Sequence, residues 1–342
     1  MIVDPVPSLH RMAAEVWKPL TLLFVWDCVV TITYYVLPFK APGLPLTIFG
    51  TGLALFLGFR SNSAYQRWWE GRTLWGAMIN ASRSLARATR NFLPDPDGRE
   101  LKREIVKRQI AYVNALRCQL RRLPIDDDVT RFLEEKDQGL ALARVNVANG
   151  LLDSTGRRID IARRTGWIDT IQQTQMEAVL VDIANAQGGM ERLKNTPLPV
   201  QYRYLPTIFT HLFCLFLPLG LVETLGLATP LGSTVAGLMF LAVLRIGDDL
   251  VDPFANTVHD VPLNAMCRTI EIDLLQSIGD PAPEPLKPVR GNTIASVTPY
   301  ALPPACPGPV PARRGHARRY APAPWGEARR SVPRPPASLP IW

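Results

Sequence analysis

The sequence has 342 residues, 47% of them hydrophobic, and a formal net charge of +8. Residues 281–342 hold 16 of the 32 prolines and nine Lys or Arg residues but only two acidic ones. We therefore expect a solvated Pro/Arg-rich disordered tail rather than a nucleic-acid-binding domain, with contact to anionic lipid headgroups as the alternative. The five cysteines are scattered without a Cys-x-x-Cys pair, which argues against a disulfide framework or a zinc site.

Four apolar stretches approach or reach the length needed to cross a bilayer, about 17–25 mostly apolar residues. They cover residues 20–37, 44–59, 205–227 and 231–246. The stretches form two pairs, each joined by a short turn that contains Pro or Gly. This arrangement favours membrane hairpins, and the buried helices of a large soluble enzyme are the alternative. No cleavable signal peptide is evident, so we expect the first stretch to remain as an anchor.

Basic residues beside these stretches predict the orientation of the chain. Arg11 and Lys18 precede the first stretch, and Arg60, Arg67 and Arg72 follow the second. Cytoplasmic loops carry the excess of Lys and Arg in membrane proteins. We therefore expect a multi-pass protein with both termini and the middle region in the cytoplasm.

The middle region shows helical periodicity with almost no strand alternation. It is too long for a loop, so it must form a helical region of its own, continuous with the membrane helices. Helices are expected over residues 64–92, 99–123, 126–136, 138–152 and 167–194. The resulting segments are 1–60 (N-terminal segment and first two membrane helices), 61–200 (cytosolic helical region), 201–280 (last two membrane helices and a following helical segment) and 281–342 (tail).

Three polar side chains lie in or near the apolar stretches. Ionisable groups within a bilayer are costly and usually face protein or water. Asp27 and Glu223 could line an ion path, or Asp27 could bond to a neighbouring helix and Glu223 could lie at the interface. His211 is expected to be a hydrogen-bonded interhelical residue rather than a ligand.

The second stretch has the most informative spacing. Thr51, Leu55 and Phe59 follow one another at i, i+4 and i+8, so they form one stripe along a helix. Such a stripe packs against protein, faces lipid, or forms a hydrophobic constriction in a ring of identical subunits. Small residues in the same stretch allow helix backbones to approach closely: Gly50, Gly52 and Gly58.

Residues 58–72 read GFRSNSAYQRWWEGR. This run resembles the bacterial bestrophins, in which a GFR-[SN]-N-x-x-Y-x-R-[WY] pattern follows the pore-lining second helix. Further similar stretches occur in the same order at residues 81–85, 196–199, 252–254 and 270–275, so the resemblance spans roughly residues 10–278 and stops before the tail. The residues that match the main pattern are Arg60, Asn62, Tyr65, Arg67 and Trp68.

The resemblance implies an all-α membrane protein with four transmembrane helices per subunit, a helical cytosolic region, and a homopentamer around a central pore. It also implies a hydrophobic pore neck, which falls on Thr51, Leu55 and Phe59. Thr51 departs from the larger apolar residue usual at its position, so one end of the neck would be wider or wetter. A second, cytosolic aperture falls on Ile183, in the segment Leu180-Val181-Asp182-Ile183.

Animal members of that family have a calcium clasp built around an acidic run. The corresponding stretch here offers Asp252 and Asp260 as weak candidates, whereas Thr257 stands where a carboxylate is needed. Calcium takes six to eight oxygen ligands. We therefore expect no cofactor. Asp248, Asp249 and Asp252 could instead lie at a helix end or pair with basic residues of the middle region.

The leading hypothesis for function is passive chloride or other anion conduction across the plasma membrane, the inner membrane of a bacterium. A monovalent-cation (sodium) channel of the same fold is the alternative, because an apolar neck does not fix the sign of the ion. A membrane scaffold or sensor is a third possibility. No catalytic motif is present, so we expect no enzyme. The expected partners are further copies of the chain, membrane lipid and the permeating monovalent ions.

Overall fold

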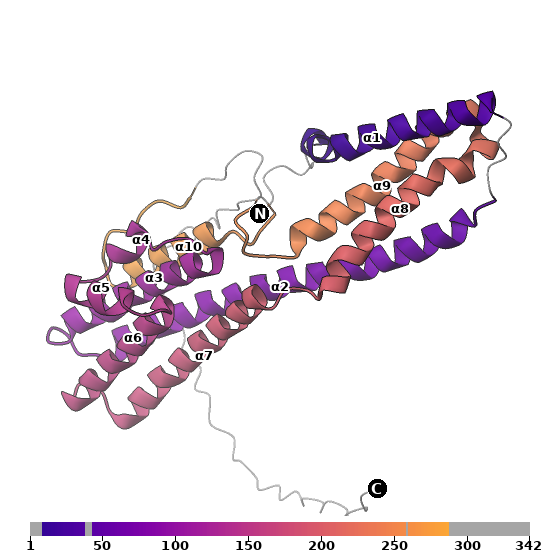
Figure 1. Cartoon of the computed structure of the whole chain (residues 1–342). Helices are drawn as coiled ribbons and strands as arrows, with labels where there is room; N and C mark the ends of the chain where they lie inside the picture. Colours follow the sequence, from indigo (N-terminus) through magenta and orange to yellow (C-terminus); the bar gives the residue numbers. More distant parts are fainter. Residues whose placement is uncertain (1–8, 38–42, 258, 287–342) are drawn as a thin grey trace, which may run out of the picture. The chain divides into compact units, whose positions relative to one another are not determined.

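The computed structural model describes residues 9–37, 43–257 and 259–286, and within these ranges the chain is helical (Figure 1). This agrees with the all-α fold expected from the sequence. The helices are α1 (Leu9–Val36), α2 (Leu46–Phe92), α3 (Arg99–Arg121), α4 (Asp127–Thr130), α5 (Glu135–Leu142), α6 (Val147–Arg164), α7 (Thr170–Asn195), α8 (Val200–Leu225), the short 3-10 helix η1 (Gly226–Ala228), α9 (Thr229–Leu250) and α10 (Leu263–Ser277).

Helix α2 connects the two ends of the described structure. Its 47 residues rise about 1.5 Å each, which makes it about 70 Å long. The first part of α2 packs against α8 and α9, and the rest packs against α3, α7 and α10. The second apolar stretch therefore does not end in a helix terminus at residue 59, because no proline or cap interrupts the helix there. The boundary drawn at residues 60 and 61 falls inside one helix.

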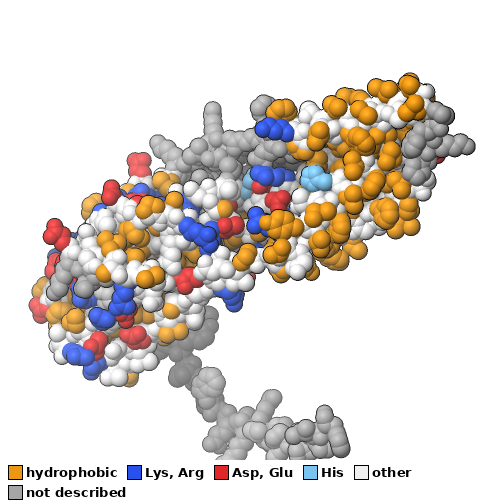
Figure 2. All heavy atoms as spheres, viewed as in Figure 1, with side chains coloured by type: hydrophobic (Ala, Val, Ile, Leu, Met, Phe, Trp, Pro, Cys, Tyr) orange, Lys and Arg blue, Asp and Glu red, His pale blue; other side chains and the backbone are white. Residues whose placement is uncertain are grey.

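The helices α1, α8 and α9 carry the long apolar stretches. Among the described residues, two segments are long and apolar enough to cross a membrane, Trp17–Val36 and Val200–Leu250, of which the second contains both α8 and α9. In an apolar 18-residue stretch of each segment, only 22% and 39% of the residues are buried in the subunit. Figure 2 shows apolar side chains covering this end of the structure, whereas charged side chains gather over the other helices. Exposure on this scale contradicts the alternative of helices buried in a soluble enzyme.

The apolar end has a small core of its own. Leu53 and Leu57 of α2 pack against Phe213 and Leu217 of α8 and Leu244 of α9. Gly50 contributes to this packing, because a Cβ atom there would lie 3.2 Å from the Phe213 ring. Gly52 and Gly58 have open space around them instead, so the expectation that all three glycines mediate helix packing holds within the subunit only for Gly50.

The main hydrophobic core lies in the other half of the structure. It is formed by the later part of α2 together with α3, α6, α7 and α10. Helix α3 runs through its centre, since Ile105, Ile110 and Leu116 have no exposed surface. The later part of α2 is thus packed against several other helices.

Several predicted helix ends were wrong. The sequence predicted helices over residues 126–136 and 138–152, but α4 is one turn, α5 ends at residue 142 and α6 begins at Val147. The Asn146 side chain accepts a 2.9 Å hydrogen bond from the Asn149 backbone N–H, which caps α6 and separates it from α5. Helix α7 begins at Thr170 behind a capping box of Asp169 and Gln172. The tail prediction lies outside the described residues from residue 287 on.

Candidate functional site

The stripe of Thr51, Leu55 and Phe59 lies on the exposed face of α2. The Leu55 and Phe59 side chains are 60% and 59% exposed, and Thr51 is also exposed. The Thr51 hydroxyl donates a 2.7 Å hydrogen bond to the Thr47 carbonyl oxygen of its own helix, so it needs no other partner. The structure thus brings the three predicted neck residues onto one exposed surface of the described part of the subunit.

The same face of α2 continues beyond residue 59 with mostly polar side chains, and the exposed Trp69 is an apolar exception. Asn62, Gln66 and Thr73 are exposed, and helical steps of three or four residues place them in line with Phe59. Thr73 donates to the Trp69 carbonyl oxygen. One helix face therefore becomes more polar beyond residue 60, without a break in the helix.

Arg60 points away from this face, into the subunit. Its guanidinium is 1% exposed, donates a 3.3 Å hydrogen bond to the Leu244 carbonyl oxygen and forms an ion pair with Asp248, both on α9. Gly247 makes this possible, because a Cβ atom there would lie 3.3 Å from the guanidinium. Arg60 therefore anchors α2 to α9 directly beside Phe59, and its charge is compensated inside the subunit.

Arg67, two turns further along α2, joins three helices. Its guanidinium donates to the Leu193 carbonyl oxygen at 2.6 Å and to the Val251 carbonyl oxygen at 3.2 Å. These carbonyls lie at the C-terminal ends of α7 and α9, where cations are favourable. Burial lowers the pKa of the Arg67 guanidinium, and the nearby Asp252 and Glu70 carboxylates oppose that shift. Arg67 is thus a positioning residue for both helix ends.

The remaining residues of the resembling pattern divide between the interior and the surface. The Trp68 indole N–H donates a 3.0 Å hydrogen bond to the His259 carbonyl oxygen, which ties α2 to the connection between α9 and α10. Tyr65 is half exposed and stacks on Trp68 and Trp69, with ring centroids 6.2 and 6.5 Å apart. Asn62 is exposed on the same face as Phe59.

Ile183 does not lie where the predicted cytosolic aperture requires it. Its side chain on α7 has no exposed surface and belongs to the main hydrophobic core. The 3.6-residue helical period puts Ile183 on the buried side together with Leu180, whereas Val181 is 56% exposed. A side chain that packs inside its own subunit does not line a passage between subunits, so the assignment of Ile183 to the aperture is corrected.

The weak calcium candidates act as hydrogen-bond acceptors in the connection between α9 and α10. Asp252 accepts from the Phe254 backbone N–H at 3.1 Å and pairs with Lys194 at 2.7 Å. Asp260 accepts from the Thr257 backbone N–H at 2.8 Å and from its hydroxyl at 2.7 Å. Burial raises the pKa of Asp260. The described residues contain no group of three His, Cys, Asp or Glu side chains arranged to hold a metal ion.

The ionisable groups of the apolar helices have separate surroundings. Asp27 on α1 is fully buried and accepts 3.0 Å hydrogen bonds from the hydroxyls of Ser233 and Thr234 on α9. Of the two roles considered for Asp27, the structure thus shows a hydrogen bond to a neighbouring helix and not a place along an ion path. Glu223 is exposed near the end of α8.

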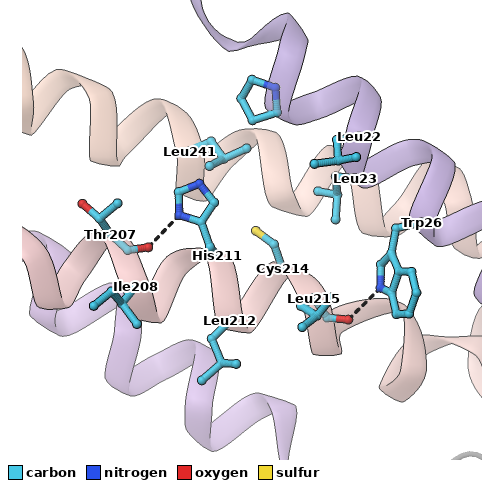
Figure 3. Close-up of a pocket in the computed structure, with 11 residues that line it drawn as sticks. Leu22, Leu23, Trp26, Thr207, Ile208, His211, Leu212, Cys214, Leu215 and Leu241 are labelled. Carbon is cyan, nitrogen blue, oxygen red and sulfur yellow. Dashed lines mark hydrogen bonds between the residues drawn. The ribbon is translucent and has the colours of Figure 1, made fainter.

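His211 was predicted to bond to another helix, but its Nδ1 lies 2.7 Å from the Thr207 carbonyl oxygen of the same helix (Figure 3). The ring lines an apolar pocket of about 560 Å³ between α1, α8 and α9. Figure 3 also shows the Trp26 indole N–H donating to the Leu215 carbonyl oxygen across this pocket. At this pocket an interhelical bond therefore comes from Trp26, which the sequence analysis did not single out.

The sequence reasoning also missed which groups meet Arg60 and Arg67. Asp248 was expected only to lie at a helix end or to pair with a basic residue of the middle region, and its partner is Arg60. The expected pairing of Asp252 with the middle region is confirmed in its contact with Lys194. The backbone acceptors of Arg67 carry no sequence signal, because every residue offers a carbonyl oxygen.

A family model described as bacterial/fungal bestrophin protein matches residues 9–276. The chain belongs to the bacterial and fungal bestrophin family. This bestrophin is 36% identical over 266 residues to a voltage-dependent anion channel-forming protein of Salmonella typhi, covering 77% of this chain and 86% of the relative. A relative of the same description from Mesorhizobium japonicum is 35% identical over 242 residues, 71% of this chain and 77% of the relative.

Solved structures of the family resemble this bestrophin closely. The crystal structure of a bacterial bestrophin homologue from Klebsiella pneumoniae superposes with a TM-score of 0.74 at 34% identity, covering 78% of this chain and 99% of the homologue. The family resemblance drawn from residues 58–72 is therefore confirmed over nearly all the described residues of this bestrophin. The family match ends before the tail, as expected.

Proposed function

We propose that this bestrophin is a membrane protein that conducts anions passively through a pore lined by α2, with chloride as the expected ion. The observation that carries the proposal is the continuous exposed face of α2, which presents the large apolar side chains of Leu55 and Phe59 beyond Thr51 and mostly polar side chains from Asn62 onward. In a homopentamer, five copies of this face would enclose one axial path. The name of the Salmonella typhi relative, a voltage-dependent anion channel-forming protein, supports the anion as the permeating ion.

The proposed membrane arrangement has four spans per subunit. Two of the supporting observations are the apolar segments Trp17–Val36 and Val200–Leu250, which supply α1, α8 and α9. The fourth span is the first part of α2, which is short and apolar up to Phe59 and packs against α8 and α9. Basic residues such as Lys18 and Arg60 favour a cytoplasmic location for both termini and for α3 to α7, in the inner membrane of a bacterium.

The proposed neck acts through hydration. A narrow apolar ring disfavours a continuous water column, and the resulting barrier lowers conductance for ions of either sign. Arg60 adds no bare charge at the inner end of the neck, since Asp248 compensates it. Thr51 has a smaller side chain at the other end, which would make that end the wider one. A sodium channel of the same fold remains the second candidate, because no fixed charge on the neck stripe selects against cations.

We propose further that conduction needs no bound metal. The oxygens of Asp252 and Asp260 already accept hydrogen bonds from Lys194, Phe254 and Thr257. Calcium would have to displace these donors and find further oxygen ligands nearby. The hydrogen bonds within the connection between α9 and α10 support this proposal.

Ion flux in liposomes tests the proposed function. The purified full-length chain is reconstituted, and reversal potentials are measured across opposing chloride and sodium gradients. We expect reversal potentials that follow the chloride gradient. Reversal potentials that follow the sodium gradient would show a cation channel instead of an anion channel. The absence of any flux from correctly folded protein would favour a scaffold or sensor function.

A further inference from the structure

A small polar pocket lies where the last turns of α2 approach the end of α10. Its volume is about 290 Å³. Three arginines of α2 line one side, Arg83, Arg87 and Arg90, and the spacing i, i+4 and i+7 places them on one helix face. Helix α10 lines the other side with Asp273, Gln276 and Ser277 among its residues. Neither the proposed pore nor the connection between α9 and α10 includes any of these side chains.

The charges in this pocket are unbalanced. Arg83 donates a 2.8 Å hydrogen bond to the Asp273 carboxylate, so the charge of this one arginine is balanced. Arg90 lies in the last turn of α2, where a cation is favourable, and its side chain makes only a 3.5 Å contact with the neighbouring Asn91. Arg87 forms no ion pair and no side-chain hydrogen bond within the described part of the chain. Three guanidinium groups therefore surround one carboxylate.

Like charges at i, i+3 and i+4 on a helix repel one another. A bound anion would relieve this repulsion, and the guanidinium groups have the planar fork geometry that matches the oxygens of a phosphate. The exposed Gln276 amide adds a neutral donor on the opposite side. The volume lies just below the usual range of ligand pockets, about 300–1,000 Å³, so the pocket suits a compact polyanion.

We propose that this pocket binds a small soluble phosphate-bearing anion of the size of pyrophosphate. A lipid headgroup carries the same chemistry, but the pocket is too far from the apolar helices to reach one. From Phe59 to Arg83 the helix runs for 24 residues, which corresponds to about 36 Å along α2. The proposal concerns binding alone and does not depend on ion conduction.

Calorimetric titration of the full-length protein in detergent with inorganic pyrophosphate, at fixed physiological ionic strength and without added phospholipid, tests the site. We expect the double variant Arg87→Gln/Arg90→Gln to bind at least tenfold more weakly than the unmodified protein. Arg87→Lys keeps the positive charge but loses the planar guanidinium that bonds two phosphate oxygens at once, so we expect severalfold weaker binding of pyrophosphate. Asp273→Asn removes the competing carboxylate, so binding should become tighter. Arg122→Gln removes an exposed charge outside the pocket and should leave the affinity unchanged.

Equal affinities of the unmodified protein and the double variant would overturn the proposal, as would the absence of binding to the unmodified protein. Equal weakening by Arg122→Gln and Arg87→Lys would also overturn it, because it would show diffuse attraction by the whole basic surface. Binding that requires added anionic phospholipid would move the site to the membrane surface and reject a soluble ligand. If the double variant fails to fold, the opposite effects expected of Arg87→Lys and Asp273→Asn decide the question.

Discussion

At the scale of single residues, the proposed function depends on which side of α2 each side chain occupies. Leu55 is 60% exposed, whereas Leu57, two positions along the same helix, is 1% exposed and packs in the small apolar core. Both residues are leucines in the same helix, so substituting each in turn compares an exposed position with a buried one. One is available to a pore and the other holds the subunit together.

We expect Leu55→Ala and Phe59→Ala to increase chloride flux through each reconstituted channel, because a smaller side chain widens and wets the neck. Flux assays at equal channel number would measure this. Leu57→Ala serves as the control and should instead lower the free energy of unfolding by about 2–5 kcal/mol without raising the flux. If both variants show the same flux as the unmodified channel, Leu55 and Phe59 do not form the neck of the pore.

Ile183 offers a second test of side-chain direction. Since it is fully buried in the main core, we expect Ile183→Ala to lower the free energy of unfolding by about 2–5 kcal/mol and to leave the ratio of ion permeabilities unchanged. Val181→Ala, on the exposed side of the same helix, should change stability by only about 0.5 kcal/mol. An altered permeability ratio in Ile183→Ala with unchanged stability would return this residue to the pore.

The contact between Arg60 and Asp248 should stabilise the subunit more than a surface ion pair does. Asp248→Asn leaves the buried guanidinium without its charged partner, so we expect a loss of about 1.5–3 kcal/mol, the range for hydrogen bonds to charged groups. Glu70→Gln is the control, because its pair with Arg192 is exposed on both sides and should contribute about 1 kcal/mol or less. Chemical denaturation of the two variants compares them, and equal losses would contradict the role given to Arg60.

At the scale of elements, the connection between α9 and α10 is held by hydrogen bonds of its own residues and by α2. Asp260 accepts twice from Thr257, and Trp68 of α2 donates to the His259 carbonyl oxygen. Phe254 is fully buried, next to Gly71 of α2, where a Cβ atom would lie 3.1 Å from its ring. These hydrogen bonds and this packing position the connection against α2.

We accordingly expect chloride flux to be the same in millimolar calcium and in an excess of chelator. Flux measured from the same proteoliposomes under both conditions would test this, with magnesium as the control for general effects of a divalent cation. A tenfold or greater loss of flux on chelation would contradict it and would point to Asp252 and Asp260 as ligands.

At the scale of the whole molecule, the described residues of one subunit expose a large apolar surface. Leu22, Ile48, Leu231 and Met239, among others, are each more than two-thirds exposed. Soluble monomers rarely expose such continuous apolar surface. Lipid and neighbouring subunits would cover it in the proposed membrane-embedded ring, and the face of α2 would then be enclosed rather than exposed to lipid.

We expect native mass spectrometry in mild detergent to give a particle with five times the 38.0 kDa mass of one chain. The five-fold arrangement follows from the proposed function, in which α2 is innermost. A stable monomer would remove the enclosed path and with it the proposed pore, and another closed ring would keep the pore but change its width.

The sequence alone determined the helical class, the positions of the apolar stretches and the family, because these depend on local composition, periodicity and the run from Gly58 to Arg72. It also determined that Thr51, Leu55 and Phe59 share a face, since the helical period fixes that relation. It did not determine that α2 passes residue 60 unbroken, because no local signal distinguishes a continued helix from a new one there.

Only the tertiary structure decided which face of each helix is buried. Ile183 and Leu55 are both apolar residues in helices. Ile183 is buried because α7 packs against α2 and α3, whereas Leu55 is exposed because no described helix packs on its side of α2. The partners of Arg60 and Arg67 are likewise more than 120 residues away along the chain. Such long-range contacts form when whole helices pack, so the charge compensation beside Phe59 became visible only in the folded subunit.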